Sequence, residues 1–259
     1  MIASDIDGTL TCSDGTMSDR TVAALAAAEE AGITVVLCTG RPPRWLPPVA
    51  ERTGHRGLAV CANGAVVYDL HTDTVIESFP FDVDVARRLA TAIKAALPEA
   101  QMAVERVDGM WREAAYVPLA KTGHTEVTFD ELLLEPMVKI IAKHPGLTST
   151  ELAEKARATV ADLADLAELT YGGSSIIEIS AVGITKAFGI ERLAAERGID
   201  AADVIAFGDM PNDIPMLRWA GRSVAVGNAH PDVLAVADEV TLSNDEDGVA
   251  VVVERLLAS

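Results

Sequence analysis

Two aspartates separated by a single isoleucine stand near the start of the chain, in the segment SDIDGTL. Asp5 and Asp7 follow a short apolar run, MIAS, that is typical of a buried strand. In an open parallel sheet, ligands bind at the carboxyl ends of the strands, so both carboxylates are expected at a binding edge. An ionised aspartate can attack phosphorus and form an aspartyl-phosphate. A second carboxyl group just past the strand end can protonate the leaving oxygen and later take a proton from water.

Three further segments place polar side chains at expected strand ends or at the start of an expected helix: Thr39-Gly40-Arg41, Lys186, and Asp209 with Asn212 and Asp213. If these segments meet the first one, four carboxylates share a site with a hydroxyl, a lysine and backbone amides. Such a set needs a cation, because like charges raise one another's pKa. Oxygen ligands without Cys or His favour Mg²⁺ over zinc. The sequence therefore predicts a magnesium site beside groups able to hold phosphoryl oxygens, namely Thr39, the amide of Gly40 and Lys186.

The elements that must position these residues alternate between strands and helices in the first and last thirds of the chain. β-branched runs such as ITVVLC (33–38) and VIAF (204–207) are typical of strands buried on both faces of a parallel sheet. Helical patterns lie between them, and Ser18 is expected to cap the first. An Asn63-Gly64 turn is expected to join two strands within residues 57–69. The pattern predicts an α/β fold with a doubly wound parallel sheet.

The middle of the chain has a different pattern. It predicts a helix over 83–97, a hairpin turning at Asp108-Gly109, and a helix over 148–167 capped by Ser149 or Thr150, with strands within 136–144 and 168–180. Hairpins mixed with helices indicate an α+β unit. We therefore expect a core domain made of residues 1–80 and 183–259, interrupted by an inserted domain of residues 81–182.

The composition limits the possible partners and location. The chain has 259 residues, is 49% hydrophobic and carries a formal net charge of -18. An acidic surface repels phosphate backbones and anionic lipid, so neither nucleic acid nor a membrane is an expected partner. The three cysteines form no paired motif, which favours a reducing compartment, and no apolar run reaches the length of a membrane span. The sequence predicts a cytoplasmic protein and indicates no oligomeric state.

The motifs occur in a familiar order: DIDGT at 5–9, TGR at 39–41, Lys186, and GDMPND at 208–213. Together they resemble the haloacid dehalogenase-like (HAD) superfamily of phosphohydrolases. The CANGA stretch at 61–65 and the place of the insert resemble the class IIB, or Cof-like, branch. The resemblance implies a Rossmannoid core with an α/β cap domain over the middle section. It also implies a Mg²⁺-dependent phosphatase acting on small phosphorylated metabolites, such as sugar phosphates, through an aspartyl-phosphate.

The resemblance also implies a role for each residue at a matching position. Asp5 is expected to be the nucleophile and Asp7 the acid–base group. The residues expected to hold the phosphoryl group are Thr39, Gly40, Lys186 and Asn212. Those expected to hold Mg²⁺ are Asp5, Asp209, Asp213 and, through its backbone carbonyl, Asp7. Arg41 and Asn63 are expected to contact the substrate.

Three other functions remain as alternatives. A phosphomutase of the same branch uses the same aspartates but needs cap residues for both ends of a bisphosphorylated sugar, and the arginines of the middle section are spread out. A binding module that has lost catalysis predicts the loss of at least one reactive residue, yet all are present. A glycosidase uses paired carboxylates but explains neither the lysine nor the Thr-Gly pair.

Overall fold

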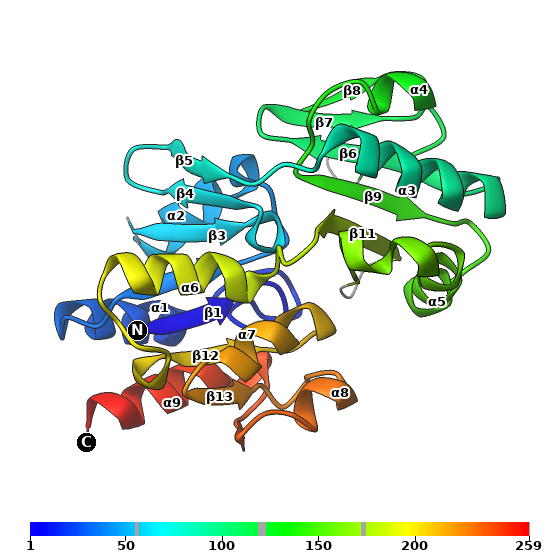
Figure 1. Ribbon diagram of the computed structural model, residues 1–259. Coiled ribbons are helices and arrows are strands. Elements are labelled where there is room, and N and C mark those ends of the chain that lie inside the picture. Colours follow the sequence, from blue (N-terminus) through cyan, green and yellow to red (C-terminus); the bar gives the residue numbers. More distant parts are fainter. Residues whose placement is uncertain (55–56, 119–122, 172–174, 259) are drawn as a thin grey trace. The chain divides into compact units, whose positions relative to one another are not determined.

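The computed structural model describes two compact units. They comprise Met1–Glu77 with Thr185–Ser259, here called the core unit, and Ser78–Ile184, here called the inserted unit. Their elements are labelled in Figure 1. The described residues are 1–54, 57–118, 123–171 and 175–258.

The core unit is built on an eight-stranded sheet with the order β14-β13-β12-β1-β2-β3-β4-β5. The strands are β1 (Ile2–Asp5), β2 (Val35–Cys38), β3 (Leu58–Cys61), β4 (Val66–Asp69), β5 (Thr74–Ser78), β12 (Ile205–Gly208), β13 (Arg222–Ala225) and β14 (Glu239–Val240). From β14 to β3 every neighbouring pair is parallel, and β4 then pairs antiparallel with β3. Strand β1 lies between β2 and β12, so the segments that follow these three strands emerge at one edge of the sheet.

Helices cover both faces of this sheet (Figure 1). They are α1 (Asp19–Glu30), α2 (Pro47–Thr53), α6 (Lys186–Glu196), α7 (Ile214–Trp219), α8 (Pro231–Leu234) and α9 (Gly248–Leu257). Helix α1 contacts α2 and α9, and helix α6 contacts α7 on the opposite face. Strands β1 and β2 are buried along their whole length. The parallel sheet between two helical layers confirms the expected α/β fold.

A helix cap and a turn of the core unit lie where the sequence predicted them. The Ser18 side chain accepts a hydrogen bond from the backbone N–H of Thr21 and caps α1. Asn63 and Gly64 lie in the turn between β3 and β4. Short 3-10 helices complete the connections and are η1 (Pro43–Trp45), η2 (Ala62–Gly64), η4 (Ala201–Asp203), η5 (Pro211–Asp213) and η6 (Asn244–Glu246). Within the described residues, no helix has both the length and the apolar character needed to cross a membrane.

The inserted unit has a second sheet, with the order β10-β11-β9-β6-β7-β8. Its strands are β6 (Gln101–Arg106), β7 (Gly109–Arg112), β8 (His124–Glu126), β9 (Lys139–Lys143), β10 (Ala167–Thr170) and β11 (Ile176–Ala181). Its helices are α3 (Val83–Ala96), α4 (Phe129–Leu132), α5 (Ser149–Thr159) and the 3-10 helix η3 (Ala161–Leu166). All neighbouring strands are antiparallel except β7 and β8. Apolar side chains of α3, α5 and the sheet form one buried cluster that includes Leu89, Ile93, Met102, Leu152 and Ile177.

Three details of the inserted unit differ from the expectations. The helix expected over 148–167 ends at Thr159, the 3-10 helix η3 follows it, and residue 167 already begins β10. Helix α5 is capped by Thr148, and not by Ser149 or Thr150, because Thr148 and Glu151 form a reciprocal capping box. The hairpin turns one residue earlier than expected, because Gly109 already pairs with Arg106 as the first residue of β7. The cap and the hairpin turn shift only a boundary, whereas the last part of the expected helix is a separate 3-10 helix.

Candidate active site

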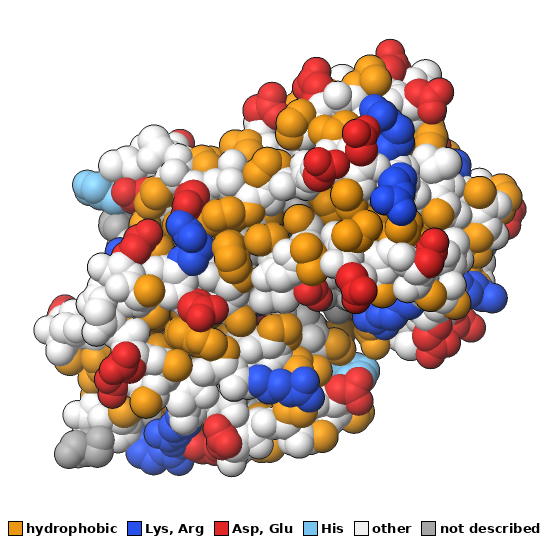
Figure 2. Space-filling model, viewed as in Figure 1, with side chains coloured by type: hydrophobic (Ala, Val, Ile, Leu, Met, Phe, Trp, Pro, Cys, Tyr) orange, Lys and Arg blue, Asp and Glu red, His pale blue; other side chains and the backbone are white. Residues whose placement is uncertain are grey.

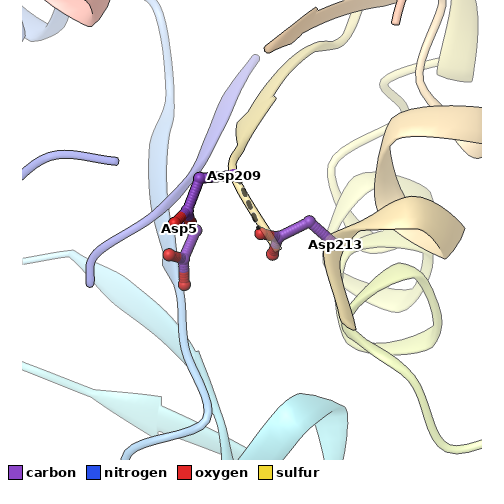
Figure 3. A group of neighbouring side chains, drawn as sticks. All are labelled: Asp5, Asp209 and Asp213. Carbon is purple, nitrogen blue, oxygen red and sulfur yellow. Dashed lines mark hydrogen bonds between the residues drawn. The ribbon is translucent and has the colours of Figure 1, made fainter. Parts of the chain in front are cut away.

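Three aspartates that are far apart in the sequence meet at the edge of the core sheet. Asp5 ends β1, Asp209 directly follows β12, and Asp213 ends η5. Each contributes a carboxylate oxygen to a group in which all these atoms lie within 4.8 Å of one another, among the residues described (Figure 3). All three are buried, with 4%, 7% and 0% of their surfaces exposed. The strand-end segments therefore converge on one acidic cluster.

The loop after β1 fits closely against Asp209. Gly8 has φ +81°, and a Cβ placed there would lie 2.4 Å from Oδ2 of Asp209, so a larger residue cannot take this place. The Thr9 hydroxyl donates a hydrogen bond to Oδ1 of Asp209 over 3.0 Å. The Gly-Thr pair of the first motif thus fixes the Asp209 carboxylate.

Asp213 is held on both of its carboxylate oxygens. Its Oδ2 accepts hydrogen bonds from the backbone N–H groups of Asp209 and Met210, both over 3.0 Å, and the first of these is drawn in Figure 3. Its Oδ1 accepts one from Lys186 over 2.6 Å. A Cβ on Gly208 would lie 2.6 Å from Cβ of Asp213, so the segment also requires glycine there. Asp213 therefore orders the loop after β12 and positions the lysine.

Lys186 is the first residue of α6, where a cation is unfavourable to the helix dipole. Its side chain is completely buried, and Nζ lies 2.5 Å from Oδ1 of Asp5 and 2.6 Å from Oδ1 of Asp213. The two ion pairs compensate for the burial of the ammonium group and for its unfavourable place at the N-terminus of the helix. Two of the three carboxylates pair with this one ammonium group, so the cluster keeps an excess of negative charge.

This crowding shifts the protonation equilibria. Burial raises the pKa of Asp5 well above its ordinary value, and the charges of Asp213 and Asp209 add to the rise while Lys186 opposes it. Burial and the charge of Asp213 likewise raise the pKa of Asp209 from 3.8 to about 6. Burial alone lowers the pKa of Lys186, but its pairs with Asp213 and Asp5 outweigh burial and raise it. The lysine therefore stays charged.

The carboxylate of Asp7 lies apart from this cluster. Its side chain is 56% exposed, and both of its oxygens accept hydrogen bonds from Arg41, over 2.8 Å from Nε and 2.5 Å from Nη2. The buried Thr39 holds the same segment, because its Oγ1 accepts a hydrogen bond from the backbone N–H of Arg41. Gly40 lies between these two residues. The side-chain geometry thus joins Asp7 to Arg41, a pairing that no sequence spacing indicates.

Asn212 and Asn63 contact each other. Nδ2 of Asn212 donates to Oδ1 of Asn63 over 3.2 Å. The Oδ1 atom of Asn212 is buried and has no hydrogen-bond partner within the described parts of the chain. A buried amide oxygen of this kind is available to accept a hydrogen bond from a bound molecule.

Sequence reasoning missed two supporting residues. Asn228 donates from Nδ2 to the carbonyl oxygen of Gly8 over 2.8 Å, and its Oδ1 accepts from the backbone N–H of Asn244 over 2.9 Å. The signal that could have found Asn228 is its place after β13, which is parallel to β12 and ends at the same edge. Asn244 carries no such signal, because it reaches the site only through tertiary packing.

Comparison with known proteins decides the family. A model of the haloacid dehalogenase-like hydrolases matches residues 2–253. The chain belongs to this family. A relative from Escherichia coli (strain K12), the pyridoxal phosphate phosphatase YbhA, is 30% identical over 96% of each chain. The expectation of a phosphoric monoester hydrolase of this family is thereby confirmed, and neither the phosphomutase nor the binding module is favoured.

Solved structures give the same assignment at the level of the fold. A haloacid dehalogenase-like hydrolase from B. subtilis matches with a TM-score of 0.86 and 26% identity, over 98% of this chain and 99% of that one. The subclass IIB sugar phosphatase BT4131 matches with a TM-score of 0.82 and 23% identity, over 98% of each chain. The HAD-like fold and the class IIB, or Cof-like, branch agree with the expectation from the motifs.

Proposed function

We propose that the protein is a Mg²⁺-dependent phosphatase of small phosphorylated metabolites, with sugar phosphates as the first candidates, and that Asp5 forms an aspartyl-phosphate. The observation that carries the proposal is the buried group of Asp5, Asp209 and Asp213 around Lys186. Three carboxylates and one lysine leave two negative charges uncompensated, which fits a divalent cation. The set contains oxygen donors only, as Mg²⁺ prefers.

The contacts of each aspartate indicate which of them would serve as metal ligands. Both oxygens of Asp213 accept hydrogen bonds, from Lys186 and from backbone N–H groups. Asp213 would therefore hold the lysine and the loop in place without binding the metal itself. Asp5 and Asp209 are then the side chains that would hold Mg²⁺, together with the backbone carbonyl of Asp7 that the family resemblance implies. The bound ion would neutralise charge on the phosphoryl group.

The chain's own residues would act in two steps. A carboxylate oxygen of Asp5 attacks phosphorus, the bond from phosphorus to the leaving oxygen breaks, and Asp7 donates a proton to that oxygen. Water then attacks phosphorus, Asp7 takes its proton, and the bond to Asp5 breaks to release inorganic phosphate. Asp7 must turn from Arg41 to do this, which frees the guanidinium group to contact the substrate.

The remaining polar groups would hold the phosphoryl group and the water. Lys186 is charged and 2.5 Å from the attacking carboxylate, so it can donate to a phosphoryl oxygen. Thr39 and the amide of Gly40 lie at the adjacent strand end and would contribute further donors. The Oδ1 atom of Asn212, buried without a partner among the described residues, would accept a hydrogen bond from the attacking water.

The substrate class rests on the relatives and on charge. The E. coli relative is named a pyridoxal phosphate phosphatase, and the class IIB structure is named a sugar phosphatase. A net charge of -18 disfavours large polyanions such as nucleic acids. We include in the proposal that the inserted unit serves as the cap domain of the enzyme.

The test is phosphate release from p-nitrophenyl phosphate and from a panel of sugar phosphates, with Mg²⁺ and with EDTA. Asp5→Asn should lower turnover by at least about 1,000-fold, because it removes the nucleophile. Asp19→Asn, at an exposed position of α1, is the matched control and should keep full activity. Mass spectrometry of the acid-quenched enzyme should find the phosphoryl group on the peptide that contains Asp5. Undiminished turnover in Asp5→Asn would remove the mechanism.

A further inference from the structure

The turn η2 between β3 and β4 has a backbone conformation that its residues seldom adopt. Ala62 has φ 51° and Asn63 has φ 57°, and both residues are buried. Alanine gains nothing from a left-handed conformation, and asparagine tolerates it best after glycine. Such strain persists only where the surroundings fix the backbone, and it concentrates at functional sites. The contacts of the turn therefore decide what it does.

The first set of contacts joins the turn to the segment after β2. The backbone N–H of Ala62 donates to the carbonyl oxygen of Arg41 over 3.0 Å. The backbone N–H of Asn63 donates to the carbonyl oxygen of Thr39, also over 3.0 Å. The turn thus holds both ends of the Thr-Gly-Arg segment that is proposed to contact the phosphoryl group.

A second contact joins the turn to the start of α6. Gly64 has φ +105°, and a Cβ placed there would lie 1.9 Å from the carbonyl oxygen of Thr185. The backbones therefore touch directly at the N-cap of the helix, one residue before Lys186. The position of the turn and the position of the buried lysine depend on each other.

The third contact is made by a side chain. Oδ1 of Asn63 accepts a hydrogen bond from Nδ2 of Asn212. This bond sets the orientation of the Asn212 side-chain amide. It leaves the buried Oδ1 of Asn212 as an acceptor without a partner among the described residues. Asn63 is itself 3% exposed, so its side chain is held in place by the same packing.

We propose that Asn63 is a positioning residue that acts through Asn212 and orients its amide toward the phosphoryl centre. This assignment replaces the expectation that Asn63 contacts the substrate, and it rests on the phosphatase function proposed above. The strained turn serves the same end, since it places one side chain against the loop after β12 while its backbone holds the loop after β2 and the start of α6. A substrate contact would affect binding, whereas a positioning residue affects turnover.

The experiment is a double-mutant cycle on kcat and KM with Asn63→Gly, Asn212→Ala and the combined variant. Glycine keeps the left-handed backbone and removes only the amide. Asn63→Gly should lower kcat by about 10- to 100-fold, the effect of a misplaced reacting group, with KM within about threefold of wild type. The combined variant should be no slower than Asn212→Ala alone, because the first change acts through the second residue.

Two controls separate position from stability. Asp73→Gly changes a residue with φ 56° in the turn between β4 and β5, so it makes the same kind of backbone change away from the site and should leave kcat unchanged. Asn63→Asp keeps an oxygen that can accept from Asn212, so it should recover most of the kcat lost in Asn63→Gly. If Asn63→Gly does not fold, Asn63→Ala completes the same cycle, because Ala62 shows that alanine can adopt this conformation.

The outcomes are distinct. Independent effects that multiply in the combined variant, or a rise in KM with kcat unchanged, would overturn the positioning role. A wild-type kcat in Asn63→Gly would do the same. Measured beside these variants, Asp5→Asn keeps the two proposals apart. An active Asp5→Asn enzyme refutes the phosphatase mechanism, whereas an inactive one with uncoupled Asn63 variants refutes only this inference.

Discussion

Lys186→Met is the substitution whose consequences the geometry defines most sharply. Methionine keeps the length of the side chain but removes the ammonium group that lies 2.5 Å from Asp5 and 2.6 Å from Asp213. Because both partners are buried, no water replaces the lost hydrogen bonds. The cluster of three carboxylates, each with an oxygen within 4.8 Å of the others, then loses the ammonium group that pairs with two of them.

The expected cost follows from the loss of one partner from a buried ion pair, which is about 3–5 kcal/mol in the free energy of unfolding. For a chain of this size, that lowers Tm by roughly 6–20 °C. Turnover should also fall by about 100- to 1,000-fold, because the donor proposed for the phosphoryl oxygens is lost. Lys155→Met is the matched control, since Lys155 is exposed on α5, and its Tm should change by about 2 °C or less.

The pH dependence supplies the decisive measurement. Without the lysine, the folded-state pKa values of Asp5 and Asp209 rise further above their unfolded values, so protonation favours the folded variant. The deficit in Tm relative to wild type, measured in EDTA by differential scanning calorimetry, should therefore shrink as pH falls from 7.5 to 5. A deficit that is absent at pH 7.5, or that grows toward pH 5, would refute the assigned charge balance.

Two other predictions follow from the same site. In EDTA, wild-type protein should lose about 3 kcal/mol of stability relative to an Asp209→Asn variant as pH rises from 3.8 to about 6, because the pKa of Asp209 is raised over that interval and its charged form is the disfavoured one. Mg²⁺ added to the wild-type protein at pH 7.5 should raise Tm, and the gain should fade below pH 6. A thermal scan series with and without Mg²⁺ measures both effects, and a gain that increases on acidification would contradict the metal assignment. Gly64→Ala should destabilise the fold by more than about 3 kcal/mol, because the new Cβ would lie 1.9 Å from the carbonyl oxygen of Thr185. Gly15→Ala is the control, because a Cβ at Gly15 would have no atom within 4 Å and should cost only about 1 kcal/mol of backbone strain. Urea titration of the two glycine variants checks this. Equal unfolding midpoints would show that the backbone at the start of α6 can move away from the new Cβ at little cost.

The sequence by itself determined the order of strands and helices in the core and the segments that carry reactive groups. Continuous β-branched runs indicate strands buried on both faces, and polar residues at their carboxyl ends must emerge at one edge of a parallel sheet. Asp5 and Asp209 could be placed together on that argument alone, whereas Lys186 begins a helix, so its place beside them does not follow from the strand ends and was implied by the family resemblance. The capping box of Thr148 and Glu151 is also a local signal, because the two residues are three positions apart, but the cap was expected one or two residues later, at Ser149 or Thr150.

Only the tertiary structure decided how those groups are paired. That Lys186 contacts Asp5 and Asp213, that Asp7 turns to Arg41, and that Asn63 holds Asn212 depend on side-chain directions and on strand order. These contacts join residues up to 181 positions apart, and nothing local encodes them. A motif specifies a side chain at a strand end, but the partner of that side chain depends on which strands and helices pack beside it.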